Sequence, residues 1–247
     1  MSEKIATLKK DGNISIITLD DGKANVFSAE MSSQVNDCLD EVPTEEGALI
    51  ISGRQGIFSG GLDLKTIQSG DMELIKDMSE KAFLLLARLF SFPRPVIAAC
   101  SGHGIALGTF LLCCCDYRIG VKGEYKIGAN EMITNMVIPI PILELIKFRV
   151  SQAYKYRSIL GAEMFSMEGA QEAGIIDDIV DEDYLADAAM EKAKYLSTMG
   201  HPSYSMTKEL LIAEPMKKIN DAIKDLKTQL QLCKDLLVKR GADSKDL

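Results

Sequence analysis

The stretch "PVIAACSGHGIALGTFLLCCCDYRIGV", residues 95–121, contains one complete strand–helix–strand unit. Its first part, Pro95–Gly102, is apolar and closed by glycine, as expected for a short buried strand. A helical pattern begins at about Leu107 and ends near Asp116, and "YRIGV" (117–121) is typical of a second strand. Apolar strands that alternate with helices predict an α/β fold, in which crossover helices cover a largely parallel sheet.

The same alternation extends towards the N-terminus. "NISIITLDDG" (13–22) predicts a strand that ends in an Asp-Gly turn, and "GALIISG" (47–53) predicts a fully buried strand. Between them, 28–43 predicts an amphipathic helix that Ser28 can cap. A longer helix is predicted over 71–93, where proline ends it.

The pattern becomes mainly helical after Ser151. Helices are predicted within 151–161, 166–174, 182–200 and 220–241, and the strand signal that remains is "IIDDIV" (175–180). We expect a core over 1–190, a C-terminal helical region over 191–247, and a frayed tail over 241–247.

Composition excludes several classes of function. Hydrophobic residues make up 47% of the 247-residue chain, enough for a sizeable core, and the net charge of -8 disfavours binding to nucleic acid. The sequence has no apolar run near the ~20 residues of a membrane span, and its start lacks a signal-peptide pattern. We therefore expect a cytoplasmic protein with no nucleic-acid or membrane partner.

Cysteine and histidine usage predicts no metal site and no disulfide framework. Three of the six cysteines are consecutive, so on a helix they point in different directions. Buried thiols in a reducing compartment are the expected state. The chain has only two histidines, which argues against a histidine metal site or a Ser-His-Asp triad. The cysteines are Cys38, Cys100, Cys113, Cys114, Cys115 and Cys233.

Two glycine-containing loops are candidates for a site built from backbone groups. "GIFSGGLDLK" (56–65) follows a predicted strand, and Gly102, Gly104 and Gly108 surround the turn that leads into the next helix. Free N–H groups and the positive end of the helix dipole meet at such a turn, so one N–H from each loop could stabilise a developing oxyanion. The alternative for both loops is a tight packing turn.

Glu131 is the candidate acid or base. It lies in "KIGANEMITNMVIP" (126–139), where isoleucine, methionine and valine surround it. A carboxyl group in an apolar pocket has a raised pKa and can act as a base near neutral pH. The alternative is a solvated glutamate at a helix start.

Taken together, these segments resemble the crotonase (enoyl-CoA hydratase/isomerase) superfamily. The family pattern F-x-A-G-A-D-L is similar to Phe58–Leu64, and its strand P-V-I-A-A-x-x-G, with C-D at the end of the next helix, matches Pro95–Gly102 and Cys115-Asp116. Its F-G-x-x-E segment matches Ile127–Glu131. Weaker elements match Ala170–Asp177, Thr207-Lys208 and "KANVFS" (23–28), so the resemblance covers nearly the whole chain.

The resemblance implies a crotonase-like ββα spiral core with a C-terminal α-helical region, assembled as a homotrimer or a dimer of trimers. It implies an acyl-CoA substrate, with coenzyme A as part of the substrate and no separate cofactor or metal. The N–H groups of Leu62 and Leu107 align with those that hold the thioester oxygen, and Glu131 aligns with the base. The positions that align with the CoA and substrate region are Lys23, Ala24, Gly60, Gly61, Lys65, Gly108 and Phe110.

One departure from the hydratase pattern indicates the reaction. Hydratases position water between two glutamates, and Phe110 stands where the first is expected. A single base, Glu131, favours an enoyl-CoA isomerase. The alternatives are an enoyl-CoA hydratase, an acyl-CoA thioester hydrolase, or an acyl-CoA-binding protein without catalysis. "PIPILELIKFR" (139–149) replaces a glycine-rich family segment, which predicts an unusual acyl pocket.

Overall fold

The computed structural model describes residues 3–226, 228 and 235. Its main sheet has six strands in the order β1-β2-β4-β7-β9-β11. All neighbouring strands run parallel except the β1–β2 hairpin, so the predicted largely parallel sheet is confirmed. The strands are β1 (Ala6–Asp11), β2 (Ile14–Leu19), β4 (Ala48–Ser52), β7 (Val96–Cys100), β9 (Tyr117–Val121) and β11 (Asp178–Val180).

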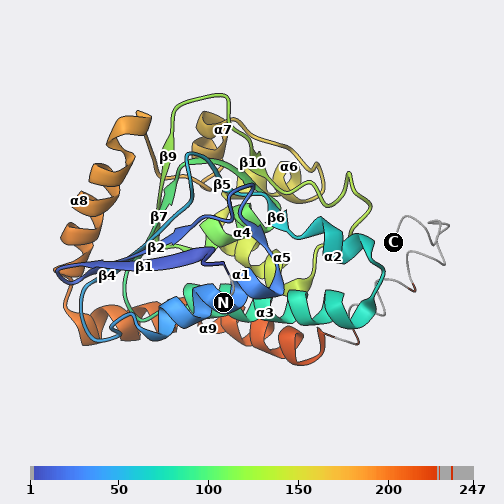
Figure 1. The fold of residues 1–247 in the computed structure, drawn as a ribbon, viewed down its shortest axis with the longest axis horizontal. Coiled ribbons are helices and arrows are strands. Elements are labelled where there is room, and N and C mark those ends of the chain that lie inside the picture. Colours follow the sequence, from blue (N-terminus) through green and yellow to red (C-terminus); the bar gives the residue numbers. More distant parts are fainter. Residues whose placement is uncertain (1–2, 227, 229–234, 236–247) are drawn as a thin grey trace.

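Helices cover both faces of this sheet, and the alternation of side chains along each strand explains how. In β4, Leu49 and Ile51 face the larger core, which α1 (Ala29–Asp40) and α3 (Met72–Phe90) cover. Ile50 faces a second core under α8 (Leu185–Ser197). Figure 1 shows α8 on one side of the sheet, with α1, α3 and α9 below its other side.

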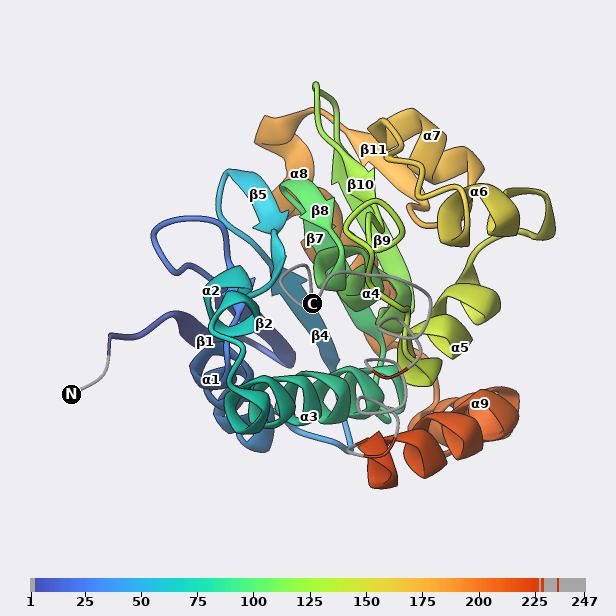
Figure 2. The same cartoon turned by 90° about the vertical axis from the view of Figure 1, so that its right-hand side faces the viewer.

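A second, three-stranded parallel sheet has the order β10-β8-β5. Each of its strands directly follows a strand of the main sheet: β5 (Gly56–Ser59), β8 (Gly102–Ile105) and β10 (Ile127–Gly128). A helix completes each turn of the chain: α2 (Leu64–Gln68) and then α3 after the first, α4 (Leu107–Cys114) after the second, and α5 (Ile140–Arg149) after the third. The predicted ββα repeat is therefore present. Figure 2 shows β5, β8 and β10 side by side, with α2 and α4 below them.

The C-terminal part is helical, as predicted. It contains the 3-10 turns Gln152–Tyr154 and Glu182–Tyr184, with α6 (Lys155–Ile159), α7 (Met167–Glu172), α8 and α9 (His201–Lys224). α9 begins 19 residues before the helix predicted over 220–241, most of which lies outside the described residues, as does the tail 241–247. The division at 190/191 falls within α8 and stays a prediction.

Buried charges attach α9 to the core. Lys208 on α9 places its Nζ 2.6 Å from Asp116 Oδ2, which also accepts the Val96 N–H at 2.9 Å. Arg118 lies two residues after Asp116 but forms its ion pair with Asp177, at 2.9 Å. The Asp116 carboxylate therefore has a structural role.

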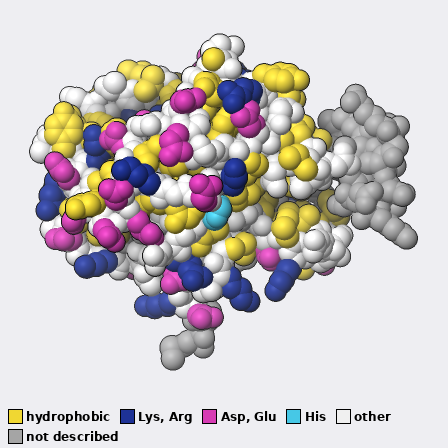
Figure 3. Space-filling model, turned by 90° about the horizontal axis from the view of Figure 1, so that it is seen from above, with side chains coloured by type: hydrophobic (Ala, Val, Ile, Leu, Met, Phe, Trp, Pro, Cys, Tyr) yellow, Lys and Arg dark blue, Asp and Glu magenta, His cyan; other side chains and the backbone are white. Residues whose placement is uncertain are grey.

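Neither a membrane-spanning helix nor a cluster of potential metal ligands is found among the described residues. None of their helices is both long and apolar enough to cross a bilayer, and none of their His, Cys, Asp and Glu side chains form a group of three suited to a metal ion. Positive and negative side chains are interspersed on the face in Figure 3. The described cysteines are free thiols, and those at 100 and 113–115 are buried, whereas Cys233 lies outside the described residues.

Candidate active site

The three candidate catalytic segments follow the carboxyl ends of the three strands of the small sheet. Gly60–Leu62 follows β5, Ala106-Leu107 follows β8, and Ala129–Glu131 follows β10. Because these strands are parallel neighbours, their carboxyl ends meet at one edge of the sheet. The fold therefore brings together two glycine-associated backbone segments and one carboxylate, although Leu62 and Glu131 are 69 residues apart in sequence.

The first segment presents the Leu62 N–H. The short strand β6 (Gly61–Leu62) pairs in parallel with β3 (Val26–Phe27), and the Asp63 N–H donates to the Phe27 carbonyl at 3.3 Å. Successive N–H groups of a strand point to opposite sides, so the Leu62 N–H points away from β3. Within the described residues, β6 has no second strand neighbour.

The second segment presents the Leu107 N–H at the first turn of α4. Ala106 precedes it with φ 50° and ψ -118°, a conformation that non-glycine residues rarely adopt and that costs about 1–3 kcal/mol. The N–H groups of Thr109 and Phe110 both donate to the Ala106 carbonyl. Within the part of the chain that the structure describes, the Leu107 N–H has no hydrogen-bond acceptor, so it is available to a ligand.

These two backbone segments pack closely against each other. Gly61 has φ 100°, and a Cβ there would lie 3.0 Å from the Ala106 Cβ and 3.5 Å from the Leu107 nitrogen. Gly108 lies against the other loop, because its Cβ would be 2.4 Å from the Ser59 carbonyl oxygen. Glycine at both positions allows the Leu62 and Leu107 N–H groups to approach each other.

Glu131 lies in the turn after β10 and is 6% exposed. Its Oε2 atom is buried without a hydrogen-bond partner, and burial raises its pKa from the ordinary value of 4.5 to about 7. A hydrogen bond from its own backbone N–H partly opposes this shift. The carboxyl group can therefore accept and release a proton near neutral pH.

Three other carboxylates, those of Asp63, Glu144 and Asp116, have partners within the fold. Asp63 caps α2 by accepting from the Lys65 N–H at 3.2 Å and from the Thr66 hydroxyl at 2.9 Å. Glu144 is buried on α5 between Lys147 and Lys218, at 2.5 and 3.6 Å. Of these carboxylates, none shares the unpartnered state of Glu131.

A sequence model of the family described as enoyl-CoA hydratase/isomerase matches residues 9–243. The chain belongs to the enoyl-CoA hydratase/isomerase family. The resemblance found in the sequence is thereby confirmed, and solved structures of family members share the fold.

Individual relatives carry both activities in their descriptions. The structure of a probable enoyl-CoA hydratase from Mycobacterium tuberculosis H37Rv aligns with a TM-score of 0.90 and 33% identity over 95% of this chain and 100% of that one. A second structure of the same M. tuberculosis protein, there described as an enoyl-CoA isomerase, aligns with a TM-score of 0.83 and 33% identity over 90% of this chain and 96% of that one. Mouse mitochondrial enoyl-CoA delta isomerase 1 is 25% identical over 80% of this chain and 70% of that protein. These comparisons establish the family, but they do not distinguish an isomerase from a hydratase.

Phe110 is the residue that the family resemblance aligns with the first hydratase glutamate. It lies on α4 in the hydrophobic core and is 2% exposed. α4 is buried throughout its length, and its eight residues, "LGTFLLCC", contain no carboxylate, histidine or lysine. This helix therefore provides backbone N–H groups at its first turn and core packing elsewhere.

The N-terminal segment of the family site is held beside Gly60. The Gly60 N–H donates to the Ala24 carbonyl at 2.7 Å, while the Lys23 side chain is exposed. Lys65 is likewise exposed on α2, close in sequence to Leu62. The structure thus places Ala24, with its sequence neighbour Lys23, beside Gly60.

Two residues shape this segment: Asn25 was not singled out from the sequence, and Asp21 was indicated only as part of a predicted Asp-Gly turn. Asn25 is fully buried with φ 50°, and its side-chain amide donates to the carbonyls of Leu19, Ile57 and Phe58. Asp21 accepts the N–H groups of Lys23, Asn25 and Val26. An Asx residue next to glycine in "DDGKAN" (20–25) is the sequence signal of such a turn.

Proposed function

We propose that the protein moves the double bond of a 3-enoyl-CoA thioester to the 2-position, using Glu131 as the single acid/base group. The observation that carries this proposal is the state of Glu131, whose buried oxygen has no partner and whose pKa is raised to about 7. A carboxyl with such a pKa can both remove and return a proton in one reaction cycle at neutral pH.

The N–H groups of Leu62 and Leu107 form the oxyanion hole in this proposal. Their loops pack backbone to backbone, and the Leu107 N–H lies at the positive end of α4. Hydrogen bonds from both groups stabilise the negative charge on the thioester oxygen as the enolate forms. Loss of one such donor typically costs about 10²–10³ in rate.

The proton balance requires no water and no further reactant. The Glu131 carboxylate takes a proton from C2 of the 3-enoyl thioester, and the electron pair moves to the thioester oxygen to give a dienolate. The same carboxyl group then returns the proton to C4, the dienolate collapses, and the double bond lies between C2 and C3. Substrate and product are isomers, and Glu131 ends as a carboxylate.

The binding part of the proposal assigns coenzyme A to the segment beside Gly60. The exposed ammonium groups of Lys23 and Lys65 suit its phosphates, and the backbone at Ala24 and Gly60 suits the adenine and pantetheine parts. Gly61, Gly108 and Phe110 shape the region around the thioester. The substrate carries the coenzyme, so no separate cofactor or metal is proposed.

Assembly and location are part of the same proposal. A homotrimer or a dimer of trimers is what the family resemblance implies, and size-exclusion chromatography with light scattering tests it. The cytoplasmic location stays a prediction, and the mouse relative is described as mitochondrial.

The test compares wild type, Glu131→Gln and Glu144→Gln with a 3-enoyl-CoA substrate. Glu144 is the matched control, because it is a buried glutamate with two lysine partners. Loss of about 10²–10⁴ in kcat is expected for Glu131→Gln with KM nearly unchanged, and no more than about threefold for Glu144→Gln. Full activity of Glu131→Gln would refute the assigned role.

Hydration is the second candidate, because the M. tuberculosis relative at 33% identity is described in one structure as a probable hydratase and in another as an isomerase. Addition of water to 2-enoyl-CoA, followed by loss of the enoyl absorbance, tests it directly. The buried Phe110 lacks the second carboxylate that would orient water, so we expect hydration to be slower than isomerisation. Tight binding of CoA esters without any turnover would indicate a binding protein instead.

A further inference from the structure

The hydroxyl group of Thr109 connects three elements of the candidate site. Thr109 lies in the first turn of α4 and is 3% exposed. Its Oγ1 donates to the Gly104 carbonyl on β8 at 2.6 Å and accepts the Gly128 N–H on β10 at 2.8 Å. A hydroxyl can donate and accept at once, so one side chain joins both strands to the helix.

These contacts lie between the segment that carries the proposed oxyanion donor, Leu107, and the segment that carries the proposed base, Glu131. Thr109 is two residues after Leu107, and Gly128 is three residues before Glu131. Gly128 is held on both sides, because its carbonyl accepts the Ala106 N–H at 2.8 Å. The backbone that carries Glu131 is thereby attached directly to the turn that presents the Leu107 N–H.

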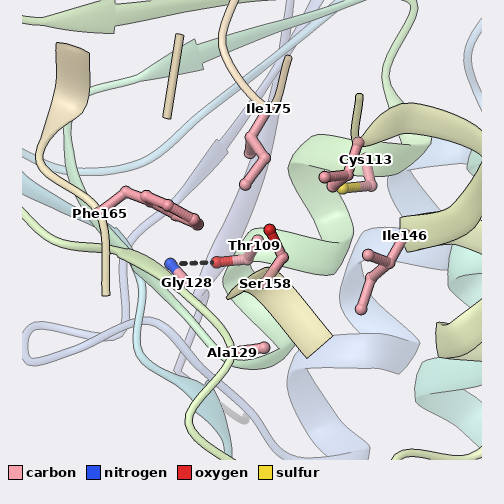
Figure 4. Close-up of a pocket in the computed structure, with 9 residues that line it drawn as sticks. Thr109, Cys113, Gly128, Ala129, Ile146, Ser158, Phe165 and Ile175 are labelled. Carbon is pink, nitrogen blue, oxygen red and sulfur yellow. Dashed lines mark hydrogen bonds between the residues drawn. The ribbon is translucent and has the colours of Figure 1, made fainter. Parts of the chain in front are cut away.

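No other described hydroxyl beside Thr109 makes the same pair of hydrogen bonds. Figure 4 shows its side chain beside a small cavity of about 10 Å³, with the bond to Gly128 and with apolar neighbours such as Phe165 and Ile175. Ser158 also lines the cavity and is buried, but its Oγ has no hydrogen-bond partner. Among the described residues that line it, the hydroxyl that bridges the strands is that of Thr109.

We propose that Thr109 is a positioning residue, which fixes the Glu131 carboxyl group relative to the Leu107 N–H. This inference rests on the proposed function, since it concerns the alignment of that base with that oxyanion donor. Valine has the shape of threonine without the hydroxyl, so it leaves both the Gly104 carbonyl and the Gly128 N–H without this partner. The turn after β10 then keeps the bond between the Ala106 N–H and the Gly128 carbonyl but loses the bond from the Gly128 N–H to α4, so Glu131 is held less firmly.

The test compares Thr109→Val with Thr109→Ser, which keeps the hydroxyl, and with Ser158→Ala, which changes the same cavity without removing a hydrogen bond. We expect Thr109→Val to lower kcat by at least about tenfold with KM within about threefold, because small misplacements of a catalytic group are costly. Thr109→Ser and Ser158→Ala are expected to keep kcat within about threefold of wild type.

A second readout does not depend on turnover. In protein labelled with carboxyl-¹³C glutamate, the Glu131 signal is identified by its loss in Glu131→Gln, and its pKa is then titrated in each variant. We expect the pKa to fall from about 7 towards 4.5 in Thr109→Val and to stay in place in the other two. If Thr109→Val does not fold, Thr109→Cys, whose thiol is a weak donor and acceptor, takes its place.

The outcomes separate the two proposals. A Thr109→Val protein that keeps its kcat and its Glu131 titration, even with lower thermal stability, gives Thr109 a merely structural role and overturns the inference. If wild type does not isomerise 3-enoyl-CoA, the proposed function fails. The Glu131 titration then still decides whether Thr109 positions that carboxyl group.

Discussion

Replacing Glu131 by glutamine should make the folded protein more stable above neutral pH. Burial raises the pKa of the native carboxyl from 4.5 to about 7, so between these values the native state holds a proton that the unfolded chain has released. Wild-type stability must therefore fall as the pH rises through this interval, and then level off. Glutamine carries no charge at any of these pH values and avoids this loss.

The size of the effect follows from the shift. One pKa unit corresponds to about 1.36 kcal/mol, so a change from 4.5 to about 7 corresponds to about 3 kcal/mol at pH 8 and to almost nothing near pH 4. For a domain of this size, about 3 kcal/mol raises the melting temperature by about 6–12 °C.

Urea denaturation at about pH 4 and pH 8 measures the difference between the variant and wild type. Other titrating groups, such as Asp21, are present in both proteins and cancel in that difference. Glu144→Gln is the control and is expected to be destabilised at pH 8, because it loses its ion pairs with Lys147 and Lys218. A Glu131→Gln advantage of the same size at both pH values would refute the reasoning.

Three further predictions follow from the described contacts. Gly61→Ala places a Cβ 3.0 Å from the Ala106 Cβ at φ 100°, so steady-state kinetics should show kcat lowered by about 10² or more. Lys208→Met leaves the Asp116 carboxylate without its 2.6 Å partner and should cost about 3–5 kcal/mol in urea unfolding, with retention of stability contradicting this. Burial raises the pKa of the Cys114 thiol, so peptide mass spectrometry after iodoacetamide treatment should find it alkylated only in unfolded protein.

The main sheet and its long helices were predictable because their residues carry clear periodicity. Strand β4 and helix α1, with Ser28 accepting the Met31 N–H at its start, lie where the pattern placed them. The strands of the small sheet were missed as strands because they have two to four residues and include Gly56, Gly102 and Gly128, which carry no hydrophobic signal.

The first part of α9, residues 201–219, was not predicted as a helix for a similar reason. Pro202 lies in its first turn and Pro215 lies inside it, and proline signals the end of a helix in sequence. Met206 and Leu210 point outward, so its apolar residues do not form one inward stripe. Its attachment through Lys208 depends on a residue far away in sequence.

The glycine-containing loops and the family resemblance were enough to predict which segments contribute to the candidate site. Position in the pattern pointed to Leu62, Leu107 and Glu131, but the burial of Glu131 depends on how segments distant in sequence pack around it. The Ala106 conformation has no signal in the sequence, and one hydroxyl in the apolar helix α4 gives no hint that Thr109 bridges two strands.

The most direct measurement is proton NMR of wild type and Glu131→Gln with a 3-enoyl-CoA in D₂O. We expect wild type to form the 2-enoyl-CoA with deuterium at C4, because the carboxyl group that takes the C2 proton can exchange it with solvent before returning it. Glu131→Gln should neither shift the double bond nor incorporate deuterium. Equal isomerisation by both proteins would contradict Glu131 as the base, and no reaction in either would contradict isomerisation of that substrate.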